Sequence, residues 1–459
     1  MTAEVRSKRR FQREGFTSHL GVLAATLGSA VGLGNIWKFP HFTGENGGAA
    51  FIFLYFGCLL LVGLPVLITE LVIGRTTNAN PVGAFKSLAP DKPWFLTGIA
   101  GCISAFLIMA FYTNVAGWVY AYIFKASLGQ LNTVNPEVTT AVFEKLAGGV
   151  WEPLFWQAVV IIIIGLIVTA GVKKGIERVT KTLMPILFLL LFISAIRALT
   201  LPNAIEGVTF LLKPDFSKVT PGVLLSAMGL SFFKLSIGIG TMITYGSYMR
   251  EQENLVATAA KVAFSDLFVS ILAGMAIFPA VFAYGFKPDA GPSLLFITIP
   301  TVFSSMPLGG LFMVLFFLLS GIAATTALIS MLEVPVAYLV EERNWSRRKA
   351  TFLTLIALMA VGSTATLSGS VLADFKVFGK TMFDLFDYTT SNILMPLGGI
   401  ATAIFAAWKW GRQNTLCELT NGGMLKPSSY TKFYLFNLKY LTPVAIVIIL
   451  LSGLGLLKL

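Results

Sequence analysis

The sequence predicts an all-α polytopic membrane protein with eleven transmembrane helices. Only 12% of its 459 residues are charged and 56% are hydrophobic, with a mean hydropathy of +0.79. A water-soluble chain carries about 25% charged residues, so this chain has too few of them to cover a water-soluble body. Apolar runs of about 18 residues or more recur along the whole length, and runs of this length can cross a bilayer as helices.

The apolar runs, taken in chain order, give the eleven candidate spans, with polar loops between them. The spans cover residues 19–42, 49–74, 95–125, 154–172, 179–199, 221–249, 257–285, 307–340, 349–367, 384–408 and 437–457.

Basic residues gather in alternate loops, and this pattern sets the expected orientation. One group precedes the first span, and the others follow spans two, four, eight and ten: Arg6, Lys8, Arg9, Arg10 and Arg13; Arg75, Lys86 and Lys92; Lys173, Lys174, Arg178 and Lys181; Arg343, Arg347, Arg348 and Lys349; Lys409, Arg412, Lys426 and Lys432. The positive-inside rule puts such loops in the cytoplasm. We therefore expect a multi-pass protein of the cell membrane with a cytoplasmic N-terminus. This topology explains the net charge of +12 better than nucleic-acid binding does.

Two Gly-x-Gly pairs indicate an internal repeat. Gly32-Leu33-Gly34 lies in the middle of the first span and Gly238-Ile239-Gly240 in the middle of the sixth, five spans later. Because five is odd, the two copies cross the membrane in opposite senses, as in an inverted-topology repeat with discontinuous helices. Close helix packing at small residues is the alternative.

The repeat divides the chain into four parts. These are a cytoplasmic leader at 1–18, a first inverted repeat at 19–199 (spans 1–5), a second at 221–408 (spans 6–10) and an extra span 11 at 437–457.

A helix that breaks inside the membrane leaves backbone groups available to a ligand. Half-helix N-termini suit a carboxylate, and half-helix C-termini offer carbonyl oxygens to an ammonium group or a metal cation. A zwitterionic amino acid fits both. No acidic side chain stands at Gly32, where a monoamine would need one. The sequence contains no nucleotide-binding, zinc or nucleophile motif, so we expect a transporter and no enzyme, with no organic cofactor.

The motifs closely resemble the neurotransmitter:sodium symporter family. The most specific are Gly28–Pro40 (GSAVGLGNIWKFP) and Glu45–Gly48 (ENGG). Others are Phe111-Tyr112 with Trp118, Lys174–Arg178 (KGIER), Thr244–Tyr248 (TYGSY) and Glu333-Val334-Pro335. The resemblance covers nearly the whole chain and implies a bacterial protein with a LeuT-type 5+5 inverted repeat and broken spans one and six. It also implies secondary active uptake of a small amino acid by alternating access.

The resemblance further implies a role for individual residues. Backbone groups of Ala30, Gly32, Leu33 and Gly34, with the hydroxyls of Tyr112 and Ser236, would bind the substrate's polar end, Phe233 would cap the site, and Ile108, Ile239 and Met331 would form the side-chain pocket. That pocket is apolar, which favours an apolar amino acid, although core packing is the alternative for its residues. Lys38 with Asp387 would form the outer gate, and Arg13 with Glu341, beside Phe16, the inner gate. Surface ion pairs of no mechanistic weight are the alternative here.

Ion coupling is where the sequence departs from the family pattern. The implied first sodium site contains Ala30, Asn35, residue 234 and Asp266, and the usual hydroxyl residue at 234 is replaced by Lys234. A lysine near the bilayer centre costs about 2.5–3.5 kcal/mol and needs a partner, so we expect Lys234 to replace the first sodium ion and to pair with Asp266. Two alternatives stay open. Lys234 could extend to an interface, or it could exchange a proton, because burial disfavours its charged form while a carboxylate favours it.

The implied second sodium site would use the carbonyl oxygens of Gly28, Val31 and Ala323 and the hydroxyl of Thr326. The adjacent position, where another ligand is usual, is Ala327, and a one-residue shift would use Thr325 instead. We therefore expect at most one sodium ion per transport cycle.

Several alternatives remain open at the level of sequence. A proton-coupled or sodium-independent amino-acid transporter is one, and a non-transporting amino-acid sensor is another, from a different functional class. Ser270 lies near a chloride ligand of chloride-dependent relatives, whereas Leu230 and Lys234 remove two others, so chloride dependence is open. The expected partners are the amino-acid substrate and the lipid bilayer, with no nucleic acid, and the protein is a monomer or a homodimer.

Overall fold

The computed structural model describes residues 14–285, 294–426 and 429–457, and within these ranges the fold is helical. The one isolated β-bridge there joins Val377 to Lys380. By length and hydropathy, eight helices of the described residues can cross a membrane, and two bent helix pairs raise this number to ten. The sixth span, which is broken, completes the predicted eleven.

The first five spans follow the predicted order, with ends within a few residues of the predicted ones except where span five begins. Span one is α2 (His19–Ala30), η1 (Gly34–Lys38) and α3 (Phe39–Glu45), and span two is α4 (Ala49–Cys58), η2 (Leu59–Gly63) and α5 (Leu64–Thr77). Span three is α7 (Phe95–Ser127), span four is α9 (Trp151–Thr169), and span five is η3 (Val172–Glu177) with α10 (Arg178–Leu199).

The second set begins with the broken sixth span, formed by α12 (Pro221–Lys234) and α13 (Thr241–Gly246). Span seven is α14 (Leu255–Ala283), span eight is α16 (Gly309–Glu342), and span nine is α17 (Arg347–Thr366) with η6 (Leu367–Gly369). Span ten is a continuous run of α18 (Met382–Tyr388), η7 (Thr389–Leu394), α19 (Met395–Ile404) and η8 (Phe405–Trp410).

The last span differs from the sequence prediction. A single span is predicted over 437–457, whereas the structure has two helices, α21 (Ser429–Lys439) and α22 (Leu441–Gly453), which meet at a bend of 44°. The polar residues of α21 lower its mean hydropathy, so a hydropathy window misses where this helix begins.

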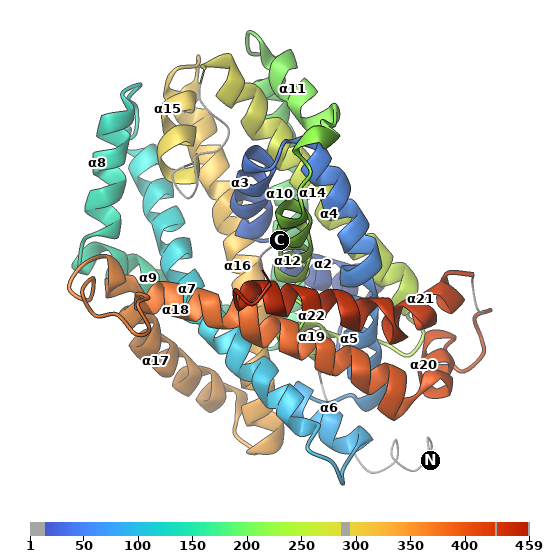
Figure 1. Cartoon of the computed structure of the whole chain (residues 1–459). Coiled ribbons are helices and arrows are strands. Elements are labelled where there is room, and N and C mark those ends of the chain that lie inside the picture. Colours follow the sequence, from blue (N-terminus) through green and yellow to red (C-terminus); the bar gives the residue numbers. More distant parts are fainter. Residues whose placement is uncertain (1–13, 286–293, 427–428, 458–459) are drawn as a thin grey trace.

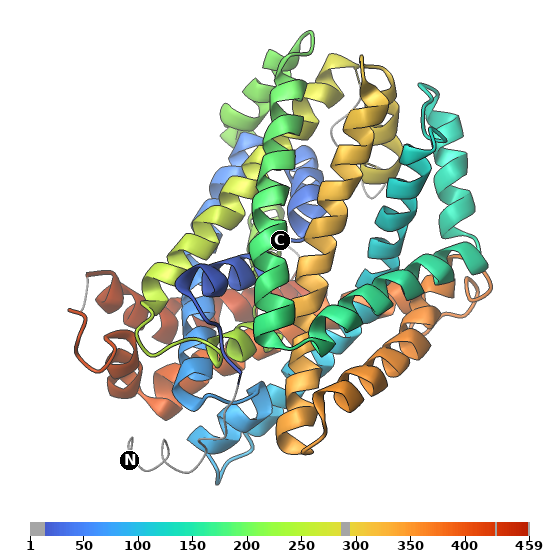
Figure 2. The same cartoon turned by 180° about the vertical axis from the view of Figure 1, so that it is seen from behind.

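Short helices that the sequence analysis did not predict connect the spans. They are α6 (Pro81–Leu88), α8 (Pro136–Ala147), α11 (Ala204–Leu212), η4 (Phe216–Lys218), η5 (Leu294–Thr298) with α15 (Ile299–Ser304), and α20 (Arg412–Leu419). In Figures 1 and 2, α8, α11 and α15 lie at the upper end of the molecule and α6 lies at the lower end. Connections therefore alternate between the two ends, as expected for a chain that crosses a membrane repeatedly.

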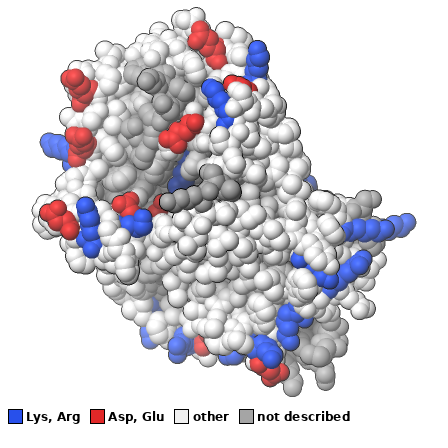
Figure 3. All heavy atoms as spheres, in the orientation of Figure 1, with Lys and Arg blue, Asp and Glu red and all other residues white. Residues whose placement is uncertain are grey.

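Charged residues also separate between the two ends. On the face seen in Figure 3, Lys and Arg dominate the lower and right edges, near α6 and α20, whereas Asp and Glu lie mostly in the upper left part. The middle of this face carries few charges, as a surface in contact with lipid would.

The two helix breaks meet in the centre of the bundle. The halves of span one are bent by 52° around residues 31–33. In span six, three residues of the break have left-handed backbone angles, with φ of 52° at Ser236, 80° at Gly238 and 77° at Gly240. The Ser236 hydroxyl donates to the carbonyl oxygen of Ser29 at 2.8 Å, which joins the second break to the first.

Glycine is required at one position of the second break in particular. A Cβ atom at Gly238 would lie 2.3 Å from the carbonyl oxygen of Met395 on α19. A side chain there would therefore clash with backbone, and the positive φ would add strain.

Candidate functional site

The first break presents backbone groups next to a tyrosine hydroxyl. The amide of Leu33 donates to Tyr112 Oη at 2.8 Å, and a Cβ atom at Gly32 would lie 3.0 Å from the same oxygen. A glycine at 32 therefore lets α7 approach the break closely. Because Tyr112 Oη accepts from Leu33, its own hydrogen can be donated to a further acceptor, such as a carboxylate.

A cavity of about 30 Å³ lies beside this break. Leu33, Gly34, Trp37, Lys38, Phe111, Tyr112, Val115, Phe233, Phe383 and Asp387 line it. Its volume is about that of one water molecule, so the site is nearly closed in this conformation. Of these residues, Trp37, Phe111, Val115 and Phe383 were not singled out as binding residues from the sequence, because apolar residues in a span are not distinguishable from core.

The other predicted substrate residues are buried around the two breaks. Ala30, Ile108, Ser236, Ile239 and Met331 are each no more than 5% exposed. Ile108 lies on α7, Met331 on α16, and Ile239 in the second break. None of the three lines the 30 Å³ cavity.

Lys234 and Asp266 form an ion pair inside the bundle. Lys234 Nζ lies 3.0 Å from Asp266 Oδ2, and both side chains are 0% exposed. The ammonium group also donates to Ser270 Oγ and lies over the rings of Phe39 and Tyr55, 4.6 and 4.5 Å from their centroids. The alternative in which Lys234 reaches an interface is therefore wrong in this structure.

The carboxylate of Asp266 has a full set of donors. Asn35 Nδ2 donates to Asp266 Oδ1 at 2.7 Å, and the Tyr55 hydroxyl donates to Asp266 Oδ2 at 2.9 Å. Asn35 Oδ1 in turn accepts from the Gly32 amide at 3.1 Å. A buried ion pair is stable only when its remaining hydrogen-bonding capacity is satisfied, and this cluster meets that condition.

The predicted second sodium site lies where α2 meets α16. A Cβ atom at Gly28 would lie 3.2 Å from Thr326 Cβ, so the two residues face each other across the helix contact. The Thr326 hydroxyl donates within its own helix to the carbonyl oxygens of Ile322 and Ala323, each at 3.1 Å. The lone pairs of this hydroxyl oxygen can therefore bind a cation. The donor set of neutral oxygens at the C-terminal end of the half-helix α2 fits sodium. Thr325 faces α7 instead and lies 2.6 Å from Tyr120 Oη, which does not favour it as the alternative ligand.

The structure places both residues of the predicted outer gate and one residue of the predicted inner gate. Lys38 Nζ lies 3.5 Å from Asp387 Oδ1 and 3.8 Å from the centroid of the Phe233 ring. Arg13 of the predicted inner gate lies outside the described residues. Its expected partner Glu341 accepts from the backbone and side-chain nitrogens of Asn80 at 2.7 and 3.0 Å.

Phe16, which is predicted to lie beside the inner gate, is buried against two tyrosines at the end of span six. It is 3% exposed, and its ring makes edge contacts with Tyr245 and Tyr248 at 5.6 and 6.0 Å. Its amide donates to the carbonyl oxygen of Tyr248 at 3.0 Å.

Two residues that stabilise the site were not predicted from the sequence. Tyr55 binds Asp266 as described, and Glu70 on α5 accepts from the Gly238 amide at 2.6 Å through Oε1. Glu70 is 0% exposed. Its carboxylate oxygen accepts the Gly238 amide, which has no helical acceptor because span six is broken there. A lone carboxylate in an apolar run is a functional signal by itself, and Glu70 could have been found that way.

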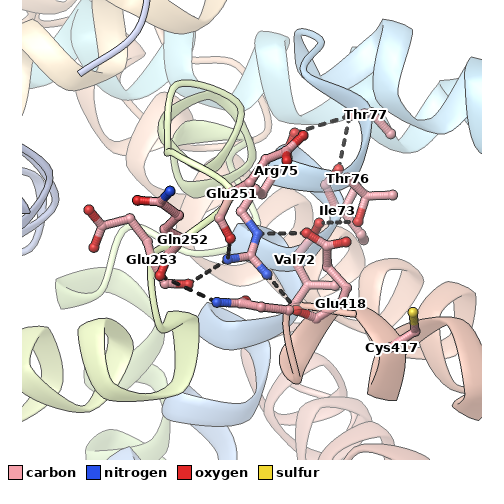
Figure 4. Close-up of polar contacts among 12 residues, drawn as sticks. Val72, Ile73, Arg75, Thr76, Thr77, Glu251, Gln252, Glu253, Cys417 and Glu418 are labelled. Atoms are coloured by element: carbon pink, nitrogen blue, oxygen red, sulfur yellow. Dashed lines mark hydrogen bonds and ion pairs between the residues drawn. The ribbon is translucent and has the colours of Figure 1, made fainter. Parts of the chain in front are cut away.

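Arg75 holds the lower end of α5 against two other segments. Its guanidinium group donates to Glu418 Oε1 at 2.6 Å and to the backbone oxygen of Glu253 at 2.5 Å (Figure 4). The carboxylate of Glu253 lies 2.5 Å from His19 Nδ1, at the start of α2. These contacts link the beginning of span one, the end of span two, the segment before span seven and helix α20, which follows span ten.

A comparison with protein-family models shows which family this chain belongs to. The model of the sodium:neurotransmitter symporter family matches residues 13–139 and 145–458. This chain belongs to the sodium:neurotransmitter symporter family.

The symporter is similar to proteins of several kingdoms. An uncharacterised sodium-dependent transporter of Bacillus subtilis (strain 168) is 40% identical over 444 residues, which cover 96% of this chain and 98% of the relative. A sodium- and chloride-dependent taurine transporter of Bos taurus is 26% identical over 475 residues, covering 92% and 75%. The crystal structure of MhsT in complex with L-phenylalanine is 43% identical, has a TM-score of 0.89, and is matched over 96% of this chain and 100% of that chain. The predicted fold class and family are confirmed.

Proposed function

We propose that this symporter takes up a small, apolar amino acid by alternating access, coupled to at most one sodium ion, with the Lys234 ammonium group in place of the first sodium ion. The observation that carries the proposal is the fully buried pair of Lys234 and Asp266 at 3.0 Å. An apolar substrate is supported by MhsT, which was solved with L-phenylalanine.

The substrate's polar end would bind at the first break. Amides of Leu33 and Gly34 begin the outer half-helix, where the helix dipole favours a carboxylate, and Tyr112 would add its hydroxyl hydrogen. Ala30 and Gly32 would offer carbonyl oxygens to the substrate ammonium group from the C-terminal end of α2. Ser236 contributes by joining the second break to Ser29.

The substrate's side chain would enter an apolar pocket. Ile108, Ile239 and Met331 would form this pocket, and Phe233 would close it beneath Lys38, whose ammonium group lies over the Phe233 ring. No charged partner is available on these residues, so a charged substrate side chain would lose its hydration without compensation.

A sodium ion has no place in the first cation site. The ammonium group of Lys234 already neutralises Asp266, and a second cation there would be repelled by it. Asn35 Oδ1, an expected sodium ligand, already accepts the amide of Gly32. Lys234 would thus act as a built-in cation that holds the first break against α14.

The second sodium site keeps its backbone oxygens and one hydroxyl. Gly28, Val31 and Ala323 would contribute carbonyl oxygens, and Thr326 its hydroxyl. The methyl group of Ala327 offers no further oxygen, which weakens the site without removing it.

We also propose that transport is independent of chloride. Lys234 and Asp266 compensate each other's charge, and Ser270 Oγ donates to the backbone oxygen of Asp266 at 2.7 Å. An added anion would therefore find the cation already paired.

Alternating access would work through the two gates and the two repeats. The pair of Lys38 and Asp387 would close the outer side, and Arg13, Glu341 and Phe16 the inner side, while the repeats at 19–199 and 221–408 move relative to each other. The basic loops near α6 and α20 support a cell-membrane protein with a cytoplasmic N-terminus. The leader at 1–18, the extra span and the choice between monomer and homodimer stay predictions.

The test is uptake of radiolabelled L-phenylalanine and L-leucine into proteoliposomes, with sodium and pH gradients imposed separately. Wild type should respond to sodium with a Hill coefficient of about 1, and Lys234→Thr should gain a second sodium dependence. Lys145→Thr, which changes an exposed lysine of α8, is the control.

Three results would change the proposal. A Hill coefficient near 2 in wild type, unchanged in Lys234→Thr, would contradict the role of Lys234. Equal uptake without sodium at several pH values would remove sodium coupling, and a dependence on the pH gradient alone would favour proton coupling. Saturable binding without uptake would indicate a sensor.

A further inference from the structure

A long apolar groove lies between α9 and α17, away from the two helix breaks. Its volume is about 630 Å³. Its lining residues are Ala158, Ile161, Ile162, Gly165, Leu166 and Thr169 of α9, and Arg348, Phe352, Leu355, Ile356 and Met359 of α17. Ten of these eleven residues are uncharged, and the exception, Arg348, stands at one end of the series.

The groove follows one face of each helix. On α9 the lining residues run from 158 to 169, and on α17 from 348 to 359, with the three- and four-residue spacing of a single helix face. Eleven steps along a helix span about 16 Å, and half of a hydrocarbon core about 30 Å thick is about 15 Å. Measured along its helices, the groove is therefore long enough to hold an acyl chain that reaches through one leaflet.

Close helix contact forms the floor of the groove. A Cβ atom at Gly165 would lie 2.2 Å from Leu355 Cδ1, so the Leu355 side chain packs directly over this glycine. Large apolar side chains stand on both walls and are more than half exposed: Ile162 and Leu166 on α9, and Phe352 and Ile356 on α17. Such walls and floor suit a flexible hydrocarbon chain.

A single cation marks the end of the groove. Arg347 turns inward, where it donates to Glu333 and, at 2.7 Å, to the backbone oxygen of Val168. The next residue, Arg348, lines the groove and is exposed. Within the described ranges, no hydrogen bond or ion pair is recorded for its guanidinium group. Lys349, beside it, lies over the ring of Trp345 at 4.8 Å.

We propose that this groove binds an acyl chain of an anionic phospholipid, with the lipid phosphate at Arg348. An arginine guanidinium matches phosphate in geometry and charge, and the lining contains no carboxylate that would repel it. The basic end faces the cytoplasm in the orientation proposed above, where anionic lipids attract basic residues. The proposal rests on that orientation only for the choice of leaflet.

A phospholipid bound in this groove would lie beside the junction of α9, α16 and α17. Arg348 follows Arg347 directly, and Arg347 joins α17 to α16 through Glu333 and to α9 through Val168. A lipid phosphate on Arg348 would hold the start of α17 in place beside this junction. Binding would therefore stabilise the contact between spans four, eight and nine.

Native mass spectrometry of the purified full-length symporter tests the proposal, with dioleoyl phosphatidylglycerol and dioleoyl phosphatidylcholine as probes. Wild type should bind one phosphatidylglycerol at least about tenfold more tightly than phosphatidylcholine. Arg348→Gln should remove this preference, whereas Lys349→Gln should keep it. Ile162→Trp, which fills the groove, should weaken both lipids, and Ile196→Trp, on the exposed face of α10, should not.

Two outcomes would overturn the proposal. One is equal retention of phosphatidylglycerol by wild type and Arg348→Gln. The other is a lipid-free dimer that Ile162→Trp disrupts, because the groove would then be covered by a second copy of the chain. Neither outcome depends on uptake, so failure here is distinguishable from failure of the proposed function.

Discussion

Removing one partner of the buried pair should destabilise the protein more than removing both. Asp266→Asn leaves the Lys234 ammonium group uncompensated in a site that is 0% exposed. Lys234→Met leaves the Asp266 carboxylate with its hydrogen bonds from Tyr55 and Asn35, so its loss should be the smaller of the two. The double variant removes both charges and keeps the approximate shape of both side chains.

The magnitude follows from the geometry of the pair. At 3.0 Å and an effective dielectric constant of about 20, Coulomb's law gives an attraction of about 5.5 kcal/mol. Breaking a buried pair by removing one partner costs about 3–5 kcal/mol, whereas replacing both partners is often close to neutral. We therefore expect Asp266→Asn to lower the free energy of unfolding by about 3–5 kcal/mol, and the double variant by clearly less than the sum of the single changes.

The assay is a double-mutant cycle on the free energy of unfolding. Each purified variant is unfolded in mixed micelles by titration with sodium dodecyl sulfate, under identical lipid and salt conditions. Lys145→Met, at an exposed position, serves as the control for loss of a lysine. Effects of Lys234→Met and Asp266→Asn that add within about 0.5 kcal/mol would refute the energetic coupling and the reasoning built on it.

Three further predictions concern the helix breaks. Glu70→Ala should lower the free energy of unfolding by about 1–3 kcal/mol, because it leaves the Gly238 amide without an acceptor. Glu70→Gln keeps an oxygen acceptor and should retain most of the free energy of unfolding. Equal losses for the two variants in the same titration would contradict this role. Tyr112→Phe should weaken substrate binding by roughly 10- to 100-fold through loss of a charge-assisted hydrogen bond, and isothermal titration showing unchanged affinity would exclude the hydroxyl. Gly238→Ala should abolish folded expression, whereas Gly229→Ala, with nothing within 4 Å, should be tolerated in size-exclusion chromatography; similar profiles would disprove the close packing.

The spans were predictable because they depend on length and hydropathy alone. Residues 95–125 were predicted and α7 covers Phe95–Ser127, and residues 307–340 were predicted where α16 covers Gly309–Glu342. The bilayer imposes these lengths. The short helices between spans and the bend before α22 carry no such signal, since tertiary contacts decide them.

The breaks and the ion pair were partly predictable. Glycine pairs marked both breaks. At the second break few other residues tolerate the backbone angles seen at Gly238 and Gly240, and at the first break Gly32 lets Tyr112 approach the backbone. A lysine inside a span requires a partner, and the family resemblance named Asp266. The distance between Lys234 and Asp266, and the bonds from Tyr55 and Asn35 that complete the cluster, depend on four segments that only the folded bundle brings together.

By itself, the sequence determined that this protein crosses a membrane many times, where its helices break, and that a lysine stands inside a span. These properties follow from local composition, which acts through hydropathy and backbone freedom. Only the tertiary structure decided that Glu70 bonds to the second break, that Thr325 faces Tyr120, and that α9 and α17 leave a groove ending at Arg348. These depend on which side chains meet across helices, because a buried polar group is stabilised only by a partner that packing brings within hydrogen-bonding distance.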